Sequence, residues 1–243
     1  MLHYRIHHAG DSALVIEFGD RIDPSLNICV LNLSTRLEAL ALTGIIETVP
    51  TFRSLMVHYD PFVLPTEELI TTIEGLVLCE GMNPTTGSVW GLPVCYDRRV
   101  AEDLESLVEH TGMSQSRFIE IHSSRVYSVY MLGFLPGQPY MGDLADELQV
   151  PRRNNPRMRI PAGSIGIATS LTCIFPMETP CGWHVIGRTP VNLWKREADP
   201  RPLLAPGDRV TFEPISFQEF EHLSAQAAQG LLILSPKISE AKA

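Results

Sequence analysis

The sequence predicts a small α+β domain, residues 1–87, followed by a small β-barrel domain, residues 88–235, and a loose tail, residues 236–243. In the first part of the chain, apolar residues alternate between strand-like and helix-like spacing. A polar, turn-rich stretch without periodicity, Gly81–Ser88, then marks a domain boundary. From Gly133 to Gly187 helical spacing is absent, and short apolar pieces alternate with glycine and proline, as in small barrels.

Strands and helices alternate in the predicted N-terminal domain. A hairpin is indicated by β-branched and aromatic positions on both sides of a turn-like tetrapeptide, His8–Asp11. In the helix that follows, leucines recur at three- and four-residue steps, Asp23 caps the first turn, and Gly44 closes the element. The strands expected here are Tyr4–His8, Ala13–Phe18, Ile45–Pro50 and Leu55–Tyr59, with a second amphipathic helix after Thr66.

The second domain begins with a strand and two helices and then becomes rich in strands. Ser114 is a helix cap after Gly112, and Ser216–Glu219 is a capping box for a last helix that ends near Gly230. The elements expected are strand Val89–Cys95, helices Ala101–His110 and Ser114–Ser123, and strands Val126–Leu132, Ser164–Ala168, Leu171–Phe175, His184–Ile186 and Arg209–Pro214.

Composition excludes several classes of protein. The 243 residues are 44% hydrophobic, enough to bury substantial cores, and the net charge of −9 repels a nucleic-acid backbone. Neither a signal peptide nor a membrane-length apolar run is recognisable, so we expect a cytoplasmic protein. The five cysteines form no Cys-x-x-Cys pair and the histidines show no ligand spacing, so we expect buried thiols and no metal site.

The strongest functional signal is a local excess of positive charge. Between Leu148 and Met177 the chain has no Asp or Glu, and prolines fix the backbone at several points. A guanidinium offers a planar fork of donors that matches a carboxylate or a phosphate. The stretch is therefore either a preorganised anion site or a rigid surface loop with solvated arginines. Its four arginines are Arg152, Arg153, Arg157 and Arg159.

Other candidates each have two interpretations. The backbone amides of Gly163 and Ser164 can approach an anion, or the glycine can serve close packing. Tyr140 can line a pocket, or its loop can cover one end of a barrel. His122 ends a helix, where the dipole favours the imidazolium form, and can be a general acid or a cap. Cys181 lacks a neighbouring base and is not expected to be a nucleophile.

Five segments together carry a more specific pattern: Glu120–Ser124, Leu132–Gly142, Pro151–Arg153, Arg159–Ile167 and Thr179–Gly187. With Gly10–Ala13 near the start and Pro206–Asp208 near the end, they resemble, in order, the family of 5-oxoprolinase B subunits, also labelled allophanate hydrolase subunit 1. The sequence departs from that family at Gln138, where an aromatic residue is usual, and at Cys181, where glycine is usual. Both departures fall in the expected pocket.

The resemblance implies a cyclophilin-like barrel that works with a homologous, larger C subunit and an A subunit. The implied reaction is the ATP-dependent opening of 5-oxoproline, a small anionic substrate, to glutamate. Because no complete nucleotide motif lies in this chain, ATP with Mg is expected to bind jointly with the partner subunit or wholly on it, and the chain alone is expected to be inactive. From residue chemistry and motif position we expect catalysis by His122 and Tyr140, and substrate binding by Arg152, Arg157, Gly163, Ser164, Gln138 and Trp183.

Two alternatives follow from the same resemblance. The family includes an inhibitor of a sporulation histidine kinase, which implies a non-catalytic regulator that binds a sensor kinase. It also resembles part of the carboxyltransferase region of urea carboxylase, which implies an accessory acting on a urea-type amide. Family membership therefore does not by itself fix the reaction.

Overall fold

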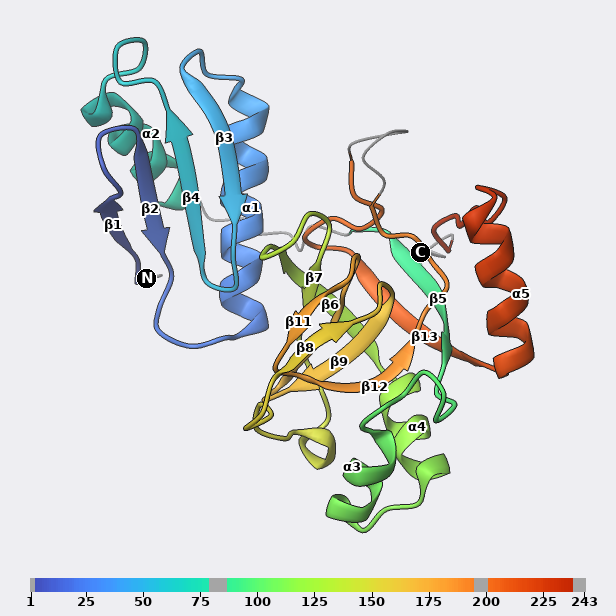
Figure 1. Cartoon of the computed structure of the whole chain (residues 1–243). Coiled ribbons are helices and arrows are strands. Elements are labelled where there is room, and N and C mark those ends of the chain that lie inside the picture. The colour runs from blue at the N-terminus through green and yellow to red at the C-terminus, as the bar shows by residue number, and fades with distance from the viewer. Residues whose placement is uncertain (1–2, 79–86, 195–200, 238–243) are drawn as a thin grey trace, which may run out of the picture. The chain divides into compact units, whose positions relative to one another are not determined.

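The computed structural model describes residues 3–78, 87–194 and 201–237. The chain divides into two compact units, Met1–Thr86 and Gly87–Ala243 (Figure 1). Most of the predicted boundary segment, Gly81–Ser88, lies outside the described residues.

The first unit is an antiparallel sheet with strand order β1-β2-β4-β3, and both helices of the unit lie on one face of it (Figure 1). Burial alternates strictly along β4, so that Leu55, Val57 and Tyr59 face the helices in one core. The elements are β1 Arg5–His8, β2 Ala13–Glu17, α1 Pro24–Leu40, β3 Ile45–Pro50, β4 Ser54–Tyr59 and α2 Thr66–Leu78.

Helix α1 begins as predicted but ends earlier. The Asp23 side chain accepts a hydrogen bond from the Ser25 amide at 2.9 Å, which confirms the N-cap. The C-cap is Ala41, in the left-handed region at φ 46°, and not Gly44. Gly44 serves close packing instead, because a Cβ there would lie 2.7 Å from the Leu64 Cβ.

The second unit contains a closed seven-stranded barrel with strand order β10-β7-β6-β13-β5-β12-β9. All pairs are antiparallel except β13 with β5, which run parallel. A separate two-stranded ribbon is formed by β8 and β11. The strands are β5 Val89–Cys95, β6 Val126–Leu132, β7 Pro139–Met141, β8 Arg157–Ile160, β9 Ser164–Ala168, β10 Leu171–Ile174, β11 Thr179–Cys181, β12 His184–Arg188 and β13 Arg209–Ile215.

The helices of this unit pack against the barrel. Ser114 and Ser216 cap α4 and α5 through their hydroxyl oxygens, as the sequence predicts. The first predicted helix is shorter than expected, because residues 101–103 form a turn that precedes α3. The helices are α3 Leu104–Thr111, α4 Gln115–Ser123, a 3₁₀ turn η1 Asp146–Leu148, and α5 Phe217–Ala228.

The C-terminal segment predicted to be loose from residue 236 is held at its start. The Lys237 amide donates to the Val89 carbonyl at 2.6 Å, and the Lys237 ammonium pairs with Glu213 at 2.6 Å. Residues 238–243 lie outside the described part of the chain. Across the described ranges, every helix is too short or too polar to span a bilayer.

Candidate functional site

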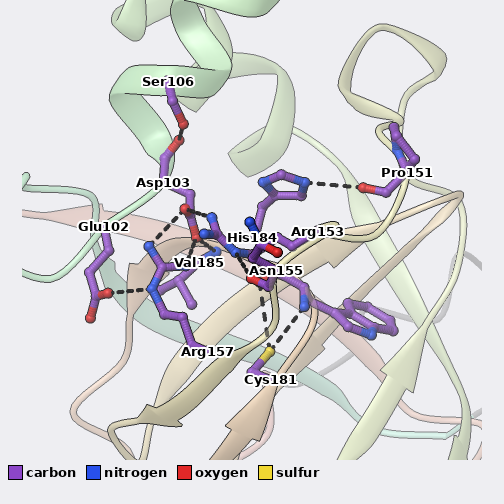
Figure 2. A network of polar contacts seen from close by, with 11 residues as sticks. Glu102, Asp103, Ser106, Pro151, Arg153, Asn155, Arg157, Cys181, His184 and Val185 are labelled. Carbon is purple, nitrogen blue, oxygen red and sulfur yellow. Dashed lines mark hydrogen bonds and ion pairs between the residues drawn. The ribbon is translucent and has the colours of Figure 1, made fainter.

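A buried carboxylate organises the arginine-rich stretch (Figure 2). Asp103, 2% exposed, stands at the start of α3, yet its side chain does not cap that helix. It turns instead toward Arg153 and Arg157, each of which donates to it, one of the Arg157 bonds being 2.8 Å. The Asp103 carboxylate also accepts from the Val185 amide at 2.7 Å, so the start of α3, the arginine stretch and β12 meet at one carboxylate.

Arg157 is therefore part of an internal ion-pair network. Its Nε lies 2.8 Å from a Glu102 oxygen, its terminal nitrogens contact Asp103, and hydrogen bonding to Asp103 raises the pKa of Arg157. The guanidinium fork that we assigned to a substrate anion is already occupied by two carboxylates. Arg157 is therefore not available to bind a substrate anion, contrary to what we expected from the sequence. Arg159 is likewise paired, with Glu178 at 2.6 Å.

Arg152 differs from the other three arginines of the stretch. Its side chain is exposed, and among the described residues it forms no ion pair. Its guanidinium carbon lies 5.8 Å from the centroid of the Trp183 ring, within the range of a cation–π contact. Of the four arginines, Arg152 is the one that has its donors available for an external anion.

The residues on both sides of Arg152 are anchored to the turn that follows β11 and to the first residue of β12. His184 Nε2 lies 3.1 Å from the Pro151 carbonyl oxygen, a contact that Figure 2 marks. The Arg153 amide donates to the Gly182 carbonyl at 2.8 Å, and the Arg153 side chain is held by Asp103. Because the backbone is fixed on each side, Arg152 is presented over Trp183 at little entropic cost on binding.

Aromatic rings line the same place. Tyr140 and Trp183 meet edge to face at 5.9 Å between centroids, and Phe175 meets Trp183 at 6.5 Å. Gly166 makes room for them, because a Cβ there would lie 2.9 Å from the Phe175 ring. Burial raises the pKa of Tyr140, so its hydroxyl is protonated at neutral pH. We call Arg152, Tyr140 and Trp183 the Arg152 face.

Two thiols lie beneath this face. Cys173 is 0% exposed and Cys181 is 4% exposed, and burial raises the pKa of both thiols. The Trp183 amide donates to the Cys181 sulfur at 3.2 Å. A thiol held protonated and enclosed is a poor nucleophile, as we expect from the sequence. The buried thiols predicted from composition are confirmed for the cysteines that the structure describes.

The Gly163–Ser164 turn does not offer its amides to an anion. The Gly163 amide donates to the Phe175 carbonyl at 2.7 Å, the Ser164 amide donates to the Pro161 carbonyl at 3.3 Å, and the Ser164 hydroxyl donates to the same carbonyl. A Cβ on Gly163 would lie 2.3 Å from the Thr189 carbonyl oxygen. The glycine is thus needed for close packing at φ 80°, which corrects the anion-binding expectation.

His122 occupies the core and not a solvent-facing helix end. It is 0% exposed, stacks on Phe212 with centroids 4.8 Å apart, and hydrogen-bonds Tyr96 at 2.7 Å through Nδ1. Burial lowers the pKa of His122 to about 3, so the imidazole is neutral near pH 7. The expected imidazolium form is therefore wrong, because desolvation outweighs the helix dipole. Among the described residues, no hydrogen bond or ring contact joins His122 to the Arg152 face.

Gln138, two residues before Tyr140 in the chain, is buried. Its side chain is 1% exposed, and its Oε1 has no hydrogen-bond partner among the described residues. Its backbone closes the preceding turn, since the Gly133 amide donates to the Gln138 carbonyl at 3.1 Å. The residue is therefore enclosed within the barrel unit and is not part of an open surface.

The structure thus brings together three of the predicted site residues, Arg152, Tyr140 and Trp183, and separates them from His122. Sequence reasoning missed Asp103 and His184. An acidic residue at the start of a predicted helix is an ordinary cap signal, and nothing local connects Asp103 with arginines fifty residues later. His184 lies within one of the motifs, but its anchoring role becomes visible only in the fold.

The described residues give no cluster of three or more His, Cys, Asp or Glu arranged around a metal ion. The carboxylates near the arginines are occupied by guanidinium groups. What the Arg152 face offers chemically is a cation, an aromatic wall and a protonated phenol. Such a set can bind and orient a small organic anion.

Comparison with known proteins identifies the class of protein to which this barrel belongs. The family model described as "Carboxyltransferase domain, subdomain C and D" matches residues 4–204, and the chain belongs to this family. It is 36% identical to the 5-oxoprolinase B subunit of Bacillus subtilis, over 89% of this chain and 95% of that protein. It is 33% identical to the 5-oxoprolinase B subunit of Escherichia coli O157:H7, over 86% and 95% of the two chains.

The fold recurs in a larger enzyme. The Kluyveromyces lactis urea carboxylase structure matches with a TM-score of 0.76 and 18% identity, over 96% of this chain and 24% of that chain. At this identity the match shows the fold alone, and it confirms that the barrel and its helices form a recurring architecture. The resemblance stated from the motifs is confirmed by the family match and by the two 5-oxoprolinase relatives.

Proposed function

We propose that this chain is the B subunit of an ATP-dependent 5-oxoprolinase and helps to bind 5-oxoproline for ring opening to L-glutamate. The observation that carries the proposal is the similarity to proteins named as B subunits of 5-oxoprolinase, which extends over 95% of the length of two of them. The Arg152 face supports it independently, because 5-oxoproline is a lactam with one free carboxylate. The cytoplasm, where ATP is available, is the compartment that we propose.

In this proposal Arg152 receives the substrate carboxylate through charge-assisted hydrogen bonds. The Trp183 ring covers one face of the small lactam ring, and the Tyr140 hydroxyl hydrogen-bonds to the lactam amide. Asp103 and His184 are positioning residues, since they hold the segments on both sides of Arg152. Phosphoryl transfer from ATP to the lactam oxygen activates the carbonyl carbon, which is a poor electrophile in an unmodified amide.

ATP with Mg is assigned to the partner subunit or to a site shared with it. Two features of this chain support that assignment. The amides of the Gly163–Ser164 turn are bonded internally, and the described residues provide no carboxylate cluster for Mg²⁺. The homologous C subunit and the A subunit are the partners that we propose, and the chain alone is then inactive.

Reconstitution tests this function. The purified chain is combined with its C and A partners, and ATP hydrolysis is measured with and without 5-oxoproline. We expect 5-oxoproline-dependent ATP hydrolysis that needs all subunits, with glutamate formed in equal amount. Background turnover by a complex whose assembly has been verified would contradict the proposal. A response only to a urea-type amide in the presence of a biotinylated partner would replace it with carboxyl transfer.

A further inference from the structure

Arg188 is a second arginine whose donors are available. It ends β12, and its Nε donates to the Ala162 carbonyl at 2.8 Å, which fixes the direction of the side chain. Within residues 3–78, 87–194 and 201–237, its terminal nitrogens have no hydrogen-bond or ion-pair partner. The side chain is only partly exposed, and its guanidinium carbon lies 5.8 Å from the Phe220 ring centroid.

It is unusual for a partly buried arginine such as Arg188 to lack an ion-pair partner. Burial lowers the pKa of Arg188, and no described carboxylate opposes that effect. Two other arginines of the unit are compensated, since Arg99 pairs with Asp97 and Arg157 pairs with Asp103. A partly buried cation without a counter-charge is costly, and a chain with a net charge of −9 has many carboxylates that could have supplied one. An external anion would satisfy the two unused terminal nitrogens.

The position is distinct from the Arg152 face. Trp183 precedes the first residue of β12 and Arg188 is the last. At a rise of about 3.3 Å per residue, the two backbones are roughly 16 Å apart along the strand. Among the described residues, no hydrogen bond, ion pair or cation–π contact joins Arg188 to Arg152 or Trp183, so the two arginines belong to separate sets of contacts.

The turn beside Arg188 is rigid. The Thr189 amide donates to the Gly163 carbonyl at 2.9 Å, and the Gly163 amide donates to the Phe175 carbonyl. Ala162, which accepts from Arg188, is part of this turn. We propose that Arg188, held by the turn Ala162–Ser164, is a second oxyanion site of this protein and binds the phosphate or carboxylate group of a small ligand.

The test is calorimetric titration of the full chain with inorganic phosphate and, separately, with acetate, at constant ionic strength in chloride buffer. We expect binding of at least one anion, and at least a tenfold loss of affinity in Arg188→Gln. Arg188→Lys retains charge but loses the fork, so it should bind with intermediate affinity. The two titrations distinguish a phosphate site from a carboxylate site.

Arg159→Gln is the matched control and should keep the affinity within about twofold, whereas Arg152→Gln reports any binding of the anion at the Arg152 face. Loss of binding in Arg152→Gln with full binding in Arg188→Gln would overturn the proposal and place the anion on the Arg152 face. If Arg188→Gln does not fold, modification of the unaltered protein with phenylglyoxal tests whether the anion binds at Arg188. The same anion must then slow modification of Arg188, mapped by mass spectrometry, and equal rates with and without it would also overturn the proposal.

Discussion

Asp103→Asn is expected to lower the free energy of unfolding of the barrel unit by about 3 kcal/mol. The carboxylate is 3% exposed and its two arginine partners are 21% and 25% exposed, so the change leaves Arg153 without a counter-charge and removes one of the two carboxylates that pair with Arg157. Breaking a buried pair in this way costs about 3–5 kcal/mol, and we expect the lower end because the arginines retain some solvent. Urea unfolding followed by tryptophan fluorescence measures it, since all three tryptophans belong to this unit.

Asp97→Asn is the matched control for Asp103→Asn. Asp97 also pairs with an arginine, Arg99, at 2.7 Å, but the two side chains are 32% and 56% exposed. Exposed pairs contribute about 0–1 kcal/mol, so the control should lose no more than that. Equal losses in the two variants would mean that the Asp103 network is not the anchor that we describe.

Acidification is expected to destabilise the barrel unit through His122. Its pKa is about 3 in the folded chain against an ordinary value of 6.5, because burial disfavours the imidazolium form. Between these values the unfolded chain binds a proton that the folded chain does not, so stability falls as pH decreases from 6.5. The expected slope is about 1.4 kcal/mol per pH unit, which amounts to about 3 kcal/mol by pH 4.5.

The measurement is urea unfolding between pH 7 and pH 4.5 for the unaltered chain and for His122→Gln. The variant should be less stable at pH 7. Its free energy of unfolding should also fall less steeply with decreasing pH, because the contribution of His122 is absent. His110→Gln changes an exposed histidine at the end of α3 and should leave the slope as it was. Identical slopes for the unaltered chain and His122→Gln would show that His122 is not held neutral by burial.

Local signals in the sequence predicted much of the fold correctly. The strands Ile45–Pro50, Val89–Cys95 and Val126–Leu132 have the predicted bounds, and the caps at Asp23 and Ser114 are confirmed. These features depend on neighbouring residues only, namely side-chain alternation and a hydroxyl or carboxylate near free helix amides. The ends of elements depend on packing, which is why α1 ends at Leu40 and not near Gly44.

Short strands and distant ion pairs could not be predicted in the same way. β7, β8 and β11 have three or four residues, contain proline or arginine, and exist because partner strands supply their hydrogen bonds. The acid-free arginine stretch indicated a local excess of positive charge, but three of its four arginines are paired with carboxylates from outside the stretch. Which of its arginines remain available depends on Asp103 and Glu102, which precede Arg157 by more than fifty residues. His122 shows the same limit, because its burial follows from tertiary packing.

Arg152, and not Arg157, receives the substrate carboxylate in the proposed site. The most direct test is the KM for 5-oxoproline in reconstituted complexes that contain Arg152→Gln, Arg157→Gln or Arg159→Gln. We predict that Arg152→Gln raises KM at least tenfold without lowering the thermal midpoint, as expected from the loss of about 1.5–3 kcal/mol of charge-assisted binding. Arg159→Gln should change neither quantity, and Arg157→Gln should lower the midpoint. An unchanged KM in Arg152→Gln, with a raised KM in an equally stable Arg157→Gln, would contradict this assignment.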